Sequence, residues 1–147
     1  MIHLHTAQID DLELILKMML TMYGELKMNF TPGVAKAVEQ MLQDSQLGEI
    51  FLIQVAGNTI GYATLSRWFS PELEGWTAYL DELWIQAESR NHGLGTEVIH
   101  ALVAQCQNQD LKTLRLELEE VNTKAQQLYQ RLGFVAEARK LMTRRLK

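Results

Sequence analysis

Apolar residues repeat at helical spacing near the start of the chain. In the first such segment they stand at Leu12, Ile15, Leu16, Met19 and Met22. Positions three and four residues apart share one helix face, so a helix is predicted here with Asp10 or Asp11 as its cap. A second helix is predicted to begin at Pro32-Gly33, since proline favours the first helical turn. Residues 3–6 are predicted to form a short strand before both helices.

The middle of the chain changes to β-rich runs. Residues 49–56 and 59–68 are rich in β-branched and aromatic side chains, and Gly57-Asn58 between them predicts an antiparallel hairpin. Residues 79–85 are mainly apolar, as expected of a strand that is covered on both faces. These runs predict the central strands of a sheet.

The second half of the chain predicts two more helices and three short strands. A helix is expected over residues 96–107, and a strand over 111–118. Asn122 or Thr123 caps a further helix that ends at Gly133. Two short strands close the chain, over residues 134–137 and 141–146. This order predicts an α/β domain with a mixed sheet, and no linker divides the chain into further domains.

The composition is that of an ordinary globular domain. The 147 residues are 47% hydrophobic and 22% charged, which excludes a disordered or fibrous chain. Cys106 is the single cysteine, so an internal disulfide and a zinc site built on several thiolates are excluded. His3 and His5 share a strand face without an apparent third ligand, so no metal is expected.

Negative charge dominates most of the chain. The net charge is −4, and a protein that binds nucleic acid usually has the opposite sign, so no such partner is expected. Five of the 14 cations lie in the last nine residues, as in a solvated last strand, with a phosphate-rich ligand or a partner as the alternative. No leader pattern is visible, and the longest uncharged stretch, 50–66, is too interrupted to cross a membrane. A cytoplasmic protein without a membrane partner is predicted.

A glycine-bearing loop stands between the predicted central strand and the next helix. It reads Arg90-Asn91-His92-Gly93-Leu94-Gly95. Free backbone amides and the positive end of a helix dipole meet at such a point and favour an anion. The dinucleotide fingerprint needs a third glycine where Val98 stands, and the Gly-Lys-Ser/Thr of a P-loop is absent. An Arg-x-x-Gly-x-Gly anion loop or a plain tight turn remains.

A second motif lies downstream, at Asn122-Thr123-Lys124-Ala125-Gln126-Gln127-Leu128-Tyr129-Gln130-Arg131-Leu132-Gly133-Phe134. With the glycine loop, it resembles the two signatures of the GNAT superfamily of acetyl-CoA-dependent N-acetyltransferases, Gln/Arg-x-x-Gly-x-Gly/Ala and Asn-x-x-Ala-x-x-Leu-Tyr-x-x-x-Gly-Phe. Residues 79–85 look like the diamine and polyamine acetyltransferase branch. The resemblance implies one N-acetyltransferase domain over residues 1–147, with a mixed, mostly antiparallel central sheet flanked by helices on both faces.

By this resemblance the chain uses acetyl-CoA as its cosubstrate and needs no metal. Backbone groups of Leu83, Trp84 and Ile85 would pair with the pantetheine arm like an added strand. The glycine loop would hold the pyrophosphate, and Asn122 would contact the pantetheine arm from the facing side. The implied loop residues are Arg90, Asn91, His92, Gly93, Leu94, Gly95 and Thr96.

Amide formation from a thioester poses two proton problems. A primary amine with a pKa near 10.4 is neutral in only about one part in a thousand near pH 7.4, so a base helps, and the departing thiolate needs a proton. Tyr129 matches the Leu-Tyr position of the family and shares a helix face with Asn122, so it is the expected acid. A core tyrosine with a satisfied hydroxyl is the alternative.

The expected base is one of two adjacent carboxylates in the central strand. Neighbouring strand residues face opposite sides of a sheet, so Asp81 and Glu82 are predicted not to serve the same spot. Asp81 is favoured, because the polyamine branch has a catalytic Glu there and water can bridge from the shorter Asp. Both carboxylates could instead be structural. An oxyanion is expected to meet a backbone N–H near Ile85.

The predicted acceptor pocket lies among the first helices and the loop after Trp68. Its carboxylates, which favour a cationic substrate, are Glu72, Glu74, Asp81 and Glu82. We therefore expect acetyl transfer from acetyl-CoA to the primary amine of a small cationic acceptor, by direct attack in a ternary complex. The alternatives are a protein N-terminal or lysine acetyltransferase and a non-catalytic acyl-CoA-binding regulator. A homodimer is expected only by analogy.

Overall fold

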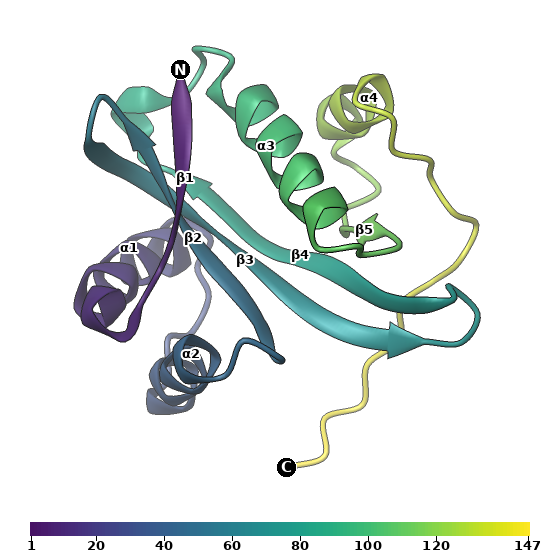
Figure 1. Ribbon diagram of the computed structural model, residues 1–147, viewed down its shortest axis with the longest axis horizontal. Coiled ribbons are helices and arrows are strands. Elements are labelled where there is room, and N and C mark those ends of the chain that lie inside the picture. The colour runs from purple at the N-terminus through teal and green to yellow at the C-terminus, as the bar shows by residue number, and fades with distance from the viewer. The chain divides into compact units, whose positions relative to one another are not determined.

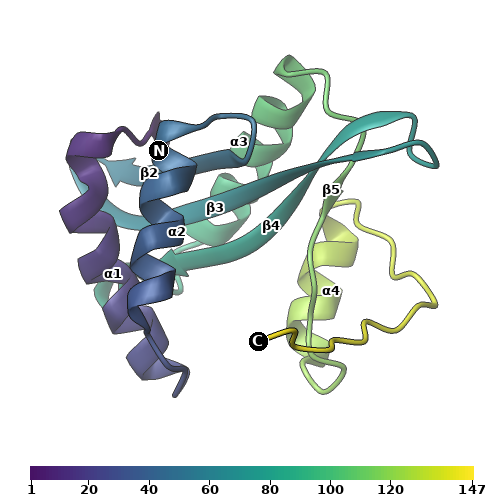
Figure 2. The same cartoon turned by 90° about the horizontal axis from the view of Figure 1, so that it is seen from below.

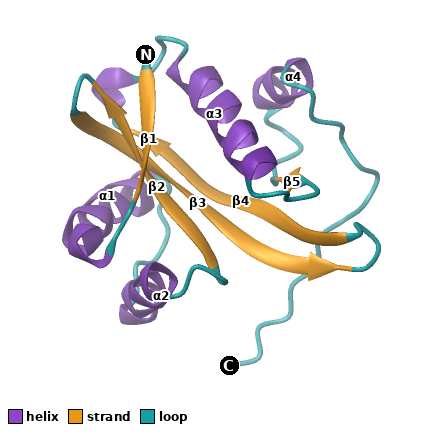
Figure 3. Ribbon diagram, viewed as in Figure 1, coloured by secondary structure: helices purple, strands orange, loops and turns teal.

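The computed structural model describes all 147 residues. The chain forms two compact units, Met1–Glu117 and Leu118–Lys147. The first unit contains a five-stranded sheet and three α-helices, and the second contains one α-helix. Helices and strands are distinguished by colour in Figure 3.

The sheet has the strand order β1-β2-β3-β4-β5, so each strand lies beside its neighbours in sequence. The first four strands are antiparallel, and β5 is parallel to β4. The bounds are β1 Ile2–Thr6, β2 Gly48–Val55, β3 Asn58–Ser70, β4 Gly75–Ile85 and β5 Leu114–Arg115. The predicted hairpin and the mixed, mostly antiparallel sheet are confirmed. β4 begins at Gly75 rather than at the predicted Tyr79, so the β3–β4 hairpin is longer than expected.

Helices cover both faces of this sheet, as predicted. α1 (Leu12–Glu25) and α2 (Pro32–Gln43) lie on one face, and α3 (Leu94–Asn108) lies on the other (Figures 1 and 2). Short 3-10 turns, Ile9–Asp11 and Ala87–Ser89, precede α1 and α3. None of the helices combines the length and the apolar character that a membrane crossing requires.

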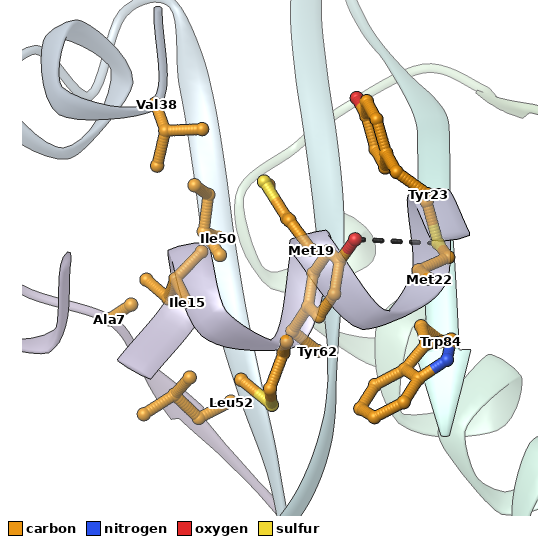
Figure 4. Packing of buried hydrophobic residues seen from close by; sticks show 11 residues of the cluster. Ala7, Ile15, Met19, Met22, Tyr23, Val38, Ile50, Leu52, Tyr62 and Trp84 are labelled. Atoms are coloured by element: carbon orange, nitrogen blue, oxygen red, sulfur yellow. Dashed lines mark hydrogen bonds between the residues drawn. The ribbon is translucent and has the colours of Figure 1, made fainter. Parts of the chain in front are cut away.

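The α1/α2 face of the sheet is packed with large, flexible or polar-tipped side chains. Met18, Met19 and Met22 of α1 are buried there, as their helical spacing predicts. They pack with Tyr62 of β3 and Trp84 of β4, and the Tyr62 hydroxyl lies 3.4 Å from the Met22 sulfur (Figure 4). Polar atoms therefore reach into the core on this side of the sheet.

The α3 face is packed with aliphatic side chains and one phenylalanine. Side chains alternate along β2, so Phe51 and Ile53 face α3, while Ile50 and Leu52 face α1 and α2. Val98, Ile99 and Leu102 of α3 cover them and are almost fully buried. Cys106 is buried in the same helix, as predicted.

The second unit begins with a loop and contains α4 (Thr123–Arg131). The Asn122 side-chain oxygen accepts a hydrogen bond of 3.1 Å from the Ala125 amide, which confirms the predicted N-cap. Gly133 has a φ of 95° just after the helix, the backbone conformation that ends helices at a glycine.

Three strand predictions are wrong in extent or in kind. The strand predicted over residues 111–118 is confined to Leu114–Arg115, because β5 leaves β4 after Tyr79 and loses its pairing partner. Residues 134–137 and 141–146 form no strand. A strand is stable only when its N–H and C=O groups pair with a neighbour, and repulsion among the basic side chains of the last nine residues opposes pairing there.

Candidate active site

A β-bulge lies in β4 at the two predicted catalytic carboxylates. Thr64 of β3 pairs with Glu82, and the next residue, Leu65, pairs with Leu80. Asp81 is therefore an extra residue without a partner on β3. A bulge of this kind bends the strand and turns the side chains that follow it.

The bulge brings both carboxylates to one cavity. Asp81 and Glu82 line a cavity of about 240 Å³ between β4 and the first two helices. The prediction that these neighbours face opposite sides is wrong, because strict alternation fails where a strand bulges. The rest of the lining comes from Met19, Tyr23, Val34, Ala37, Val38, Met41, Ile50 and Thr64. Glu72 and Glu74 were expected here but belong to the tip of the β3–β4 hairpin and do not line the cavity.

Glu82 is held by two buried phenols. Its Oε2 accepts a hydrogen bond of 2.7 Å from Tyr23 of α1, and its Oε1 accepts one of 2.9 Å from Tyr62 of β3. Burial raises the pKa of both phenols well above the ordinary tyrosine value, and the charge of Glu82 raises it further. Both phenols therefore remain protonated donors at neutral pH. The two carboxylate oxygens are fixed in place.

Asp81 has a different environment from its neighbour. Its side chain is exposed, and its Oδ2 accepts a hydrogen bond from the Ser66 hydroxyl. Close by on β4, the Tyr79 hydroxyl donates to Glu117, and burial raises the pKa of this phenol too. Asp81 is thus the accessible carboxylate of the pair and Glu82 the enclosed one.

The edge of β4 opposite β3 is unpaired after Tyr79. The Ala78 amide donates to Thr113 on the β5 side, whereas the Gln86 amide donates to Ile60 on the β3 side. In a regular strand, the main-chain groups of residues an even number apart point to the same side. Ala78 and Gln86 are eight residues apart but point to opposite sides, so the bulge at Asp81 has reversed the direction of the main-chain groups that follow it. The main-chain groups of Leu83 and Ile85 consequently point away from β3, where β5 no longer pairs.

Trp84 lies between these two residues, and its main chain points toward β3. A Cβ added at Gly61 would meet the Trp84 carbonyl oxygen at 2.1 Å, so only glycine allows this approach. The Trp84 side chain is buried, and its indole N–H donates to Glu25 Oε1 over 2.9 Å. Of the three predicted strand residues, Leu83 and Ile85 have backbone groups at the open edge.

Glu25 connects this strand to the glycine loop. Arg90 donates to Glu25 over 2.8 Å, and the Arg90 Nε donates to the Ile85 carbonyl over 2.7 Å. The hydrogen bonds from Trp84 and Arg90 lower the pKa of the Glu25 carboxyl below its ordinary value. The Glu25 carboxylate therefore links the last turn of α1 to the end of β4 and to the start of the glycine loop.

The glycine loop leads into the start of α3. Gly93 is the N-cap, with a φ of 74°, and Asn91 also has a positive φ of 66°. The first α3 amide to reach back belongs to Glu97, which donates to the Gly93 carbonyl. The preceding helical amides, of Leu94, Gly95 and Thr96, are the ones that a helix leaves for a ligand or water. His92 is exposed in the loop, and its Nδ1 lies 3.3 Å from the Ser89 carbonyl oxygen.

Asn122 and Tyr129 belong to the second unit. The oxygen of the Asn122 side chain caps α4, and its amide nitrogen is not used by that bond. The Tyr129 ring packs edge-on against Phe134 at 5.5 Å between centroids. Burial raises the pKa of the Tyr129 phenol, which keeps it protonated at neutral pH.

Sequence reasoning missed three residues of this site. Tyr23, Tyr62 and Glu25 lie outside both motifs, and no pattern in the sequence singles them out. A signal was present, since a carboxylate inside a central strand requires hydrogen-bond donors when it is buried. The donors could have been sought among the tyrosines, but their identity depends on how α1 crosses the sheet.

Solved structures share this fold over nearly the whole chain. An integron cassette protein from the mobile metagenome of Cole Harbour Salt Marsh is 25% identical, with a TM-score of 0.85 and coverage of 98% of this chain and 90% of that one. A ribosomal-protein-alanine N-acetyltransferase from Brucella melitensis biovar Abortus 2308 is 17% identical, with a TM-score of 0.76 and coverage of 98% and 99%. An aminoglycoside acetyltransferase from an uncultured soil metagenomic sample is 15% identical, with a TM-score of 0.80 and coverage of 99% and 96%.

A family model extends this likeness from fold to sequence. No curated protein shows significant sequence similarity to the chain. The model described as the acetyltransferase (GNAT) family, however, matches residues 19–134, which include the cavity, the glycine loop and the second motif. The chain therefore belongs to the GNAT acetyltransferase family and is an acetyl-CoA-dependent N-acetyltransferase.

Proposed function

We propose that the enzyme transfers acetyl from acetyl-CoA to the primary amine of a small cationic acceptor, by direct attack in a ternary complex. The observation that carries this proposal is the bulge in β4. Within a few residues of one strand, the bulge places two carboxylates at a cavity and main-chain groups at an open strand edge. An amine and a thioester held on these two sides would meet at the bulge.

The residues of β4 and α3 fit acetyl-CoA. The main-chain groups of Leu83 and the amide of Ile85 can receive the amide groups of a pantetheine arm like an added strand, whereas the Ile85 carbonyl already accepts a hydrogen bond from Arg90. The amides of Leu94, Gly95 and Thr96 suit the pyrophosphate, because the helix start is electropositive. Asn122 is proposed to contact the arm through its side-chain amide nitrogen. When bound, acetyl-CoA supplies the activated acetyl group.

The two carboxylates are proposed to have separate roles. Asp81 acts as the base, directly or through water, because it is exposed and its hydrogen bond from Ser66 uses only one oxygen. Glu82 has both oxygens occupied by phenols, so it attracts and orients the cationic amine as a fixed negative charge. Tyr129 is proposed as the acid that protonates the departing thiolate, and its burial keeps the proton on the phenol.

The protein-directed alternative has less support. One fold neighbour is named a ribosomal-protein-alanine N-acetyltransferase and another an aminoglycoside acetyltransferase, so fold alone does not choose between a protein and a small acceptor. The cavity beside Asp81, with a volume of about 240 Å³, is of a size to receive a small acceptor, and this favours the small-acceptor proposal. A nucleic-acid partner is disfavoured by the net charge of −4. The cytoplasmic location and the homodimer remain predictions.

The test is the release of CoA thiol across a panel of amines. Asp81→Asn is expected to lower kcat/KM by about a hundredfold or more and to shift its pH dependence to higher pH, as expected for loss of a base. Tyr129→Phe should lower kcat with little change in acetyl-CoA affinity. Glu74→Gln, an exposed carboxylate change at the hairpin tip, is the control and should leave both constants unchanged. Binding of acetyl-CoA without thiol release with any amine of the panel would instead support the non-catalytic acyl-CoA-binding regulator.

A further inference from the structure

The cavity beside the carboxylates has two chemically different parts. Its polar groups gather around Glu82, since Thr64 is its partner across the strands and Tyr23 donates to it. Asp81 stands next to it. The remaining lining is apolar and comes from Met19, Val34, Ala37, Val38, Met41 and Ile50. In the view of Figure 4, Val38 and Ile50 lie on the other side of Met19 from Tyr23.

A cavity with carboxylates at one end only is unsuited to an acceptor that carries a positive charge at both of its ends. No carboxylate lines the apolar part of the cavity. A second ammonium or a cluster of sugar hydroxyls placed there would lose part of its water without gaining hydrogen bonds, which is unfavourable. An apolar group placed there would be stabilised by burial, and the flexible side chains of Met19 and Met41 can adapt to its shape.

The size of the cavity also limits the acceptor. Its volume is about 240 Å³. A short alkyl or aryl group fills such a space, whereas an aminoglycoside would extend out of it into solvent. The charge of the site is concentrated at Asp81 and Glu82, where one ammonium group would complement it.

From these observations we infer that the preferred acceptor is a primary monoamine carried on a compact apolar body, and not a polyamine or an aminoglycoside. The inference rests on the proposed function, since it assumes that this cavity receives the acceptor. It narrows the expected cationic class to amines with a single charge. The amine lies at Asp81 and Glu82, and the apolar body lies against α2 and β2.

The experiment compares amines that differ only at the far end. Hexylamine and hexamethylenediamine have the same length, and the second carries an ammonium where the first carries a methyl group. We expect kcat/KM, measured by thiol release, to be at least about tenfold higher for hexylamine, because an unpaired ammonium is disfavoured in an apolar wall. From propylamine to hexylamine, kcat/KM should rise about three- to fourfold per methylene until the cavity is filled.

A pair of variants ties this preference to the cavity. Ala37 is an exposed residue of α2 that lines the apolar part, so Ala37→Asp adds a carboxylate there without burying a large side chain. It should shift the ratio of the two kcat/KM values toward the diamine by about tenfold. Gln43→Asp makes a similar charge change at the exposed end of the same helix, outside the cavity, and should leave the ratio within about twofold.

Each outcome separates the inference from the proposed function. Faster turnover of hexamethylenediamine, of an aminoglycoside or of a peptide with an N-terminal leucine would overturn the inference and leave the acetyltransferase proposal standing or redirected to peptides. A hexylamine preference that Ala37→Asp does not alter would also overturn it, because the selection would then lie elsewhere. Absence of thiol release with every amine, while acetyl-CoA still binds, would overturn the proposed function itself.

Discussion

The two faces of the sheet differ in how completely they are filled and in what fills them. Beneath α3, the side chains of Phe51, Ile53 and Leu102 are at most 1% exposed and carry no polar atoms. Beneath α1 and α2, two methionines, Tyr23 and several aliphatic residues line a cavity, and the carboxylate of Glu82 at this cavity is hydrogen-bonded by two phenols. The same strands, β2 and β3, supply both faces through the alternation of their side chains.

This difference indicates a division of labour within one sheet. The α3 face contributes stability through apolar burial, and it holds the helix whose start forms the glycine loop. The α1/α2 face keeps a cavity and a half-buried charge, both of which are unfavourable for stability, and the phenols of Tyr23 and Tyr62 stabilise that charge by hydrogen bonds. Features of the second kind are expected at a catalytic site.

The largest expected effect tests this division directly. Phe51→Ala should lower the free energy of unfolding by about 3–5 kcal/mol, because it leaves a void in a filled core. Met41→Ala on the other face should cost at most about 2 kcal/mol, because Met41 already borders a cavity. Urea unfolding followed by circular dichroism measures both. Equal losses would show that the two faces are packed alike.

The next effect concerns the phenols around Glu82. Tyr62→Phe removes a hydrogen bond to a charged acceptor in the interior and should cost about 1.5–3 kcal/mol. The same deletion at Tyr79, whose partner Glu117 is exposed, should cost less than about 1 kcal/mol. Urea unfolding of the two variants provides the comparison. A larger loss at Tyr79 would contradict the idea that enclosure strengthens the Glu82 contacts.

A double-mutant cycle shows whether the Tyr62 effect acts through Glu82. With Glu82→Gln already present, Tyr62→Phe should cost less than in the natural chain, since a neutral amide attracts the phenol less than a carboxylate does. Additive losses would assign the effect to packing against Met22, which the Tyr62 hydroxyl also approaches.

Much of the fold could be predicted from the sequence. The hairpin around Gly57-Asn58, the helix at Pro32 and the cap at Asn122 depend on local preferences that a short segment already contains. The strands predicted at 134–137 and 141–146 failed for the opposite reason. A strand is defined by its partner, and alternating apolar residues in one segment do not reveal whether a partner is present.

The site was predictable in its residue types and not in its geometry. The glycine loop and the adjacent carboxylates are visible in the sequence, because each is a contiguous motif. The bulge at Asp81 is not, since it depends on how Thr64 and Leu65 are matched across the strands. This single register shift brought the two carboxylates, which were expected on opposite faces, to one cavity. It also turned Leu83 and Ile85 toward the open edge.

The smallest expected effect concerns Cys106, a titratable group in the otherwise apolar core on the α3 face. Burial raises the pKa of the Cys106 thiol from its ordinary value of 9.0 to about 11, and the charge of Glu49 adds to this. The unfolded chain therefore releases the thiol proton at lower pH than the folded protein does. The contribution of Cys106 to stability is fully present below pH 9 and is lost as the pH rises toward 11.

Between pH 8 and pH 10 this linkage should remove about 1.4 kcal/mol from the free energy of unfolding. Cys106→Ala removes the thiol. Between pH 8 and pH 10 the free energy of unfolding of this variant should therefore fall by about 1.4 kcal/mol less than that of the natural protein. The packing that the substitution removes lowers stability equally at every pH and does not alter this difference. Urea unfolding at a series of pH values gives both slopes, and the tyrosines, which also titrate in this range, contribute equally to the two proteins. Parallel slopes would mean that the thiol ionises as readily in the folded protein as in the unfolded chain. The α3 face would then admit water beneath the helix, and its contrast with the cavity face would be weaker than the burial of Cys106 implies.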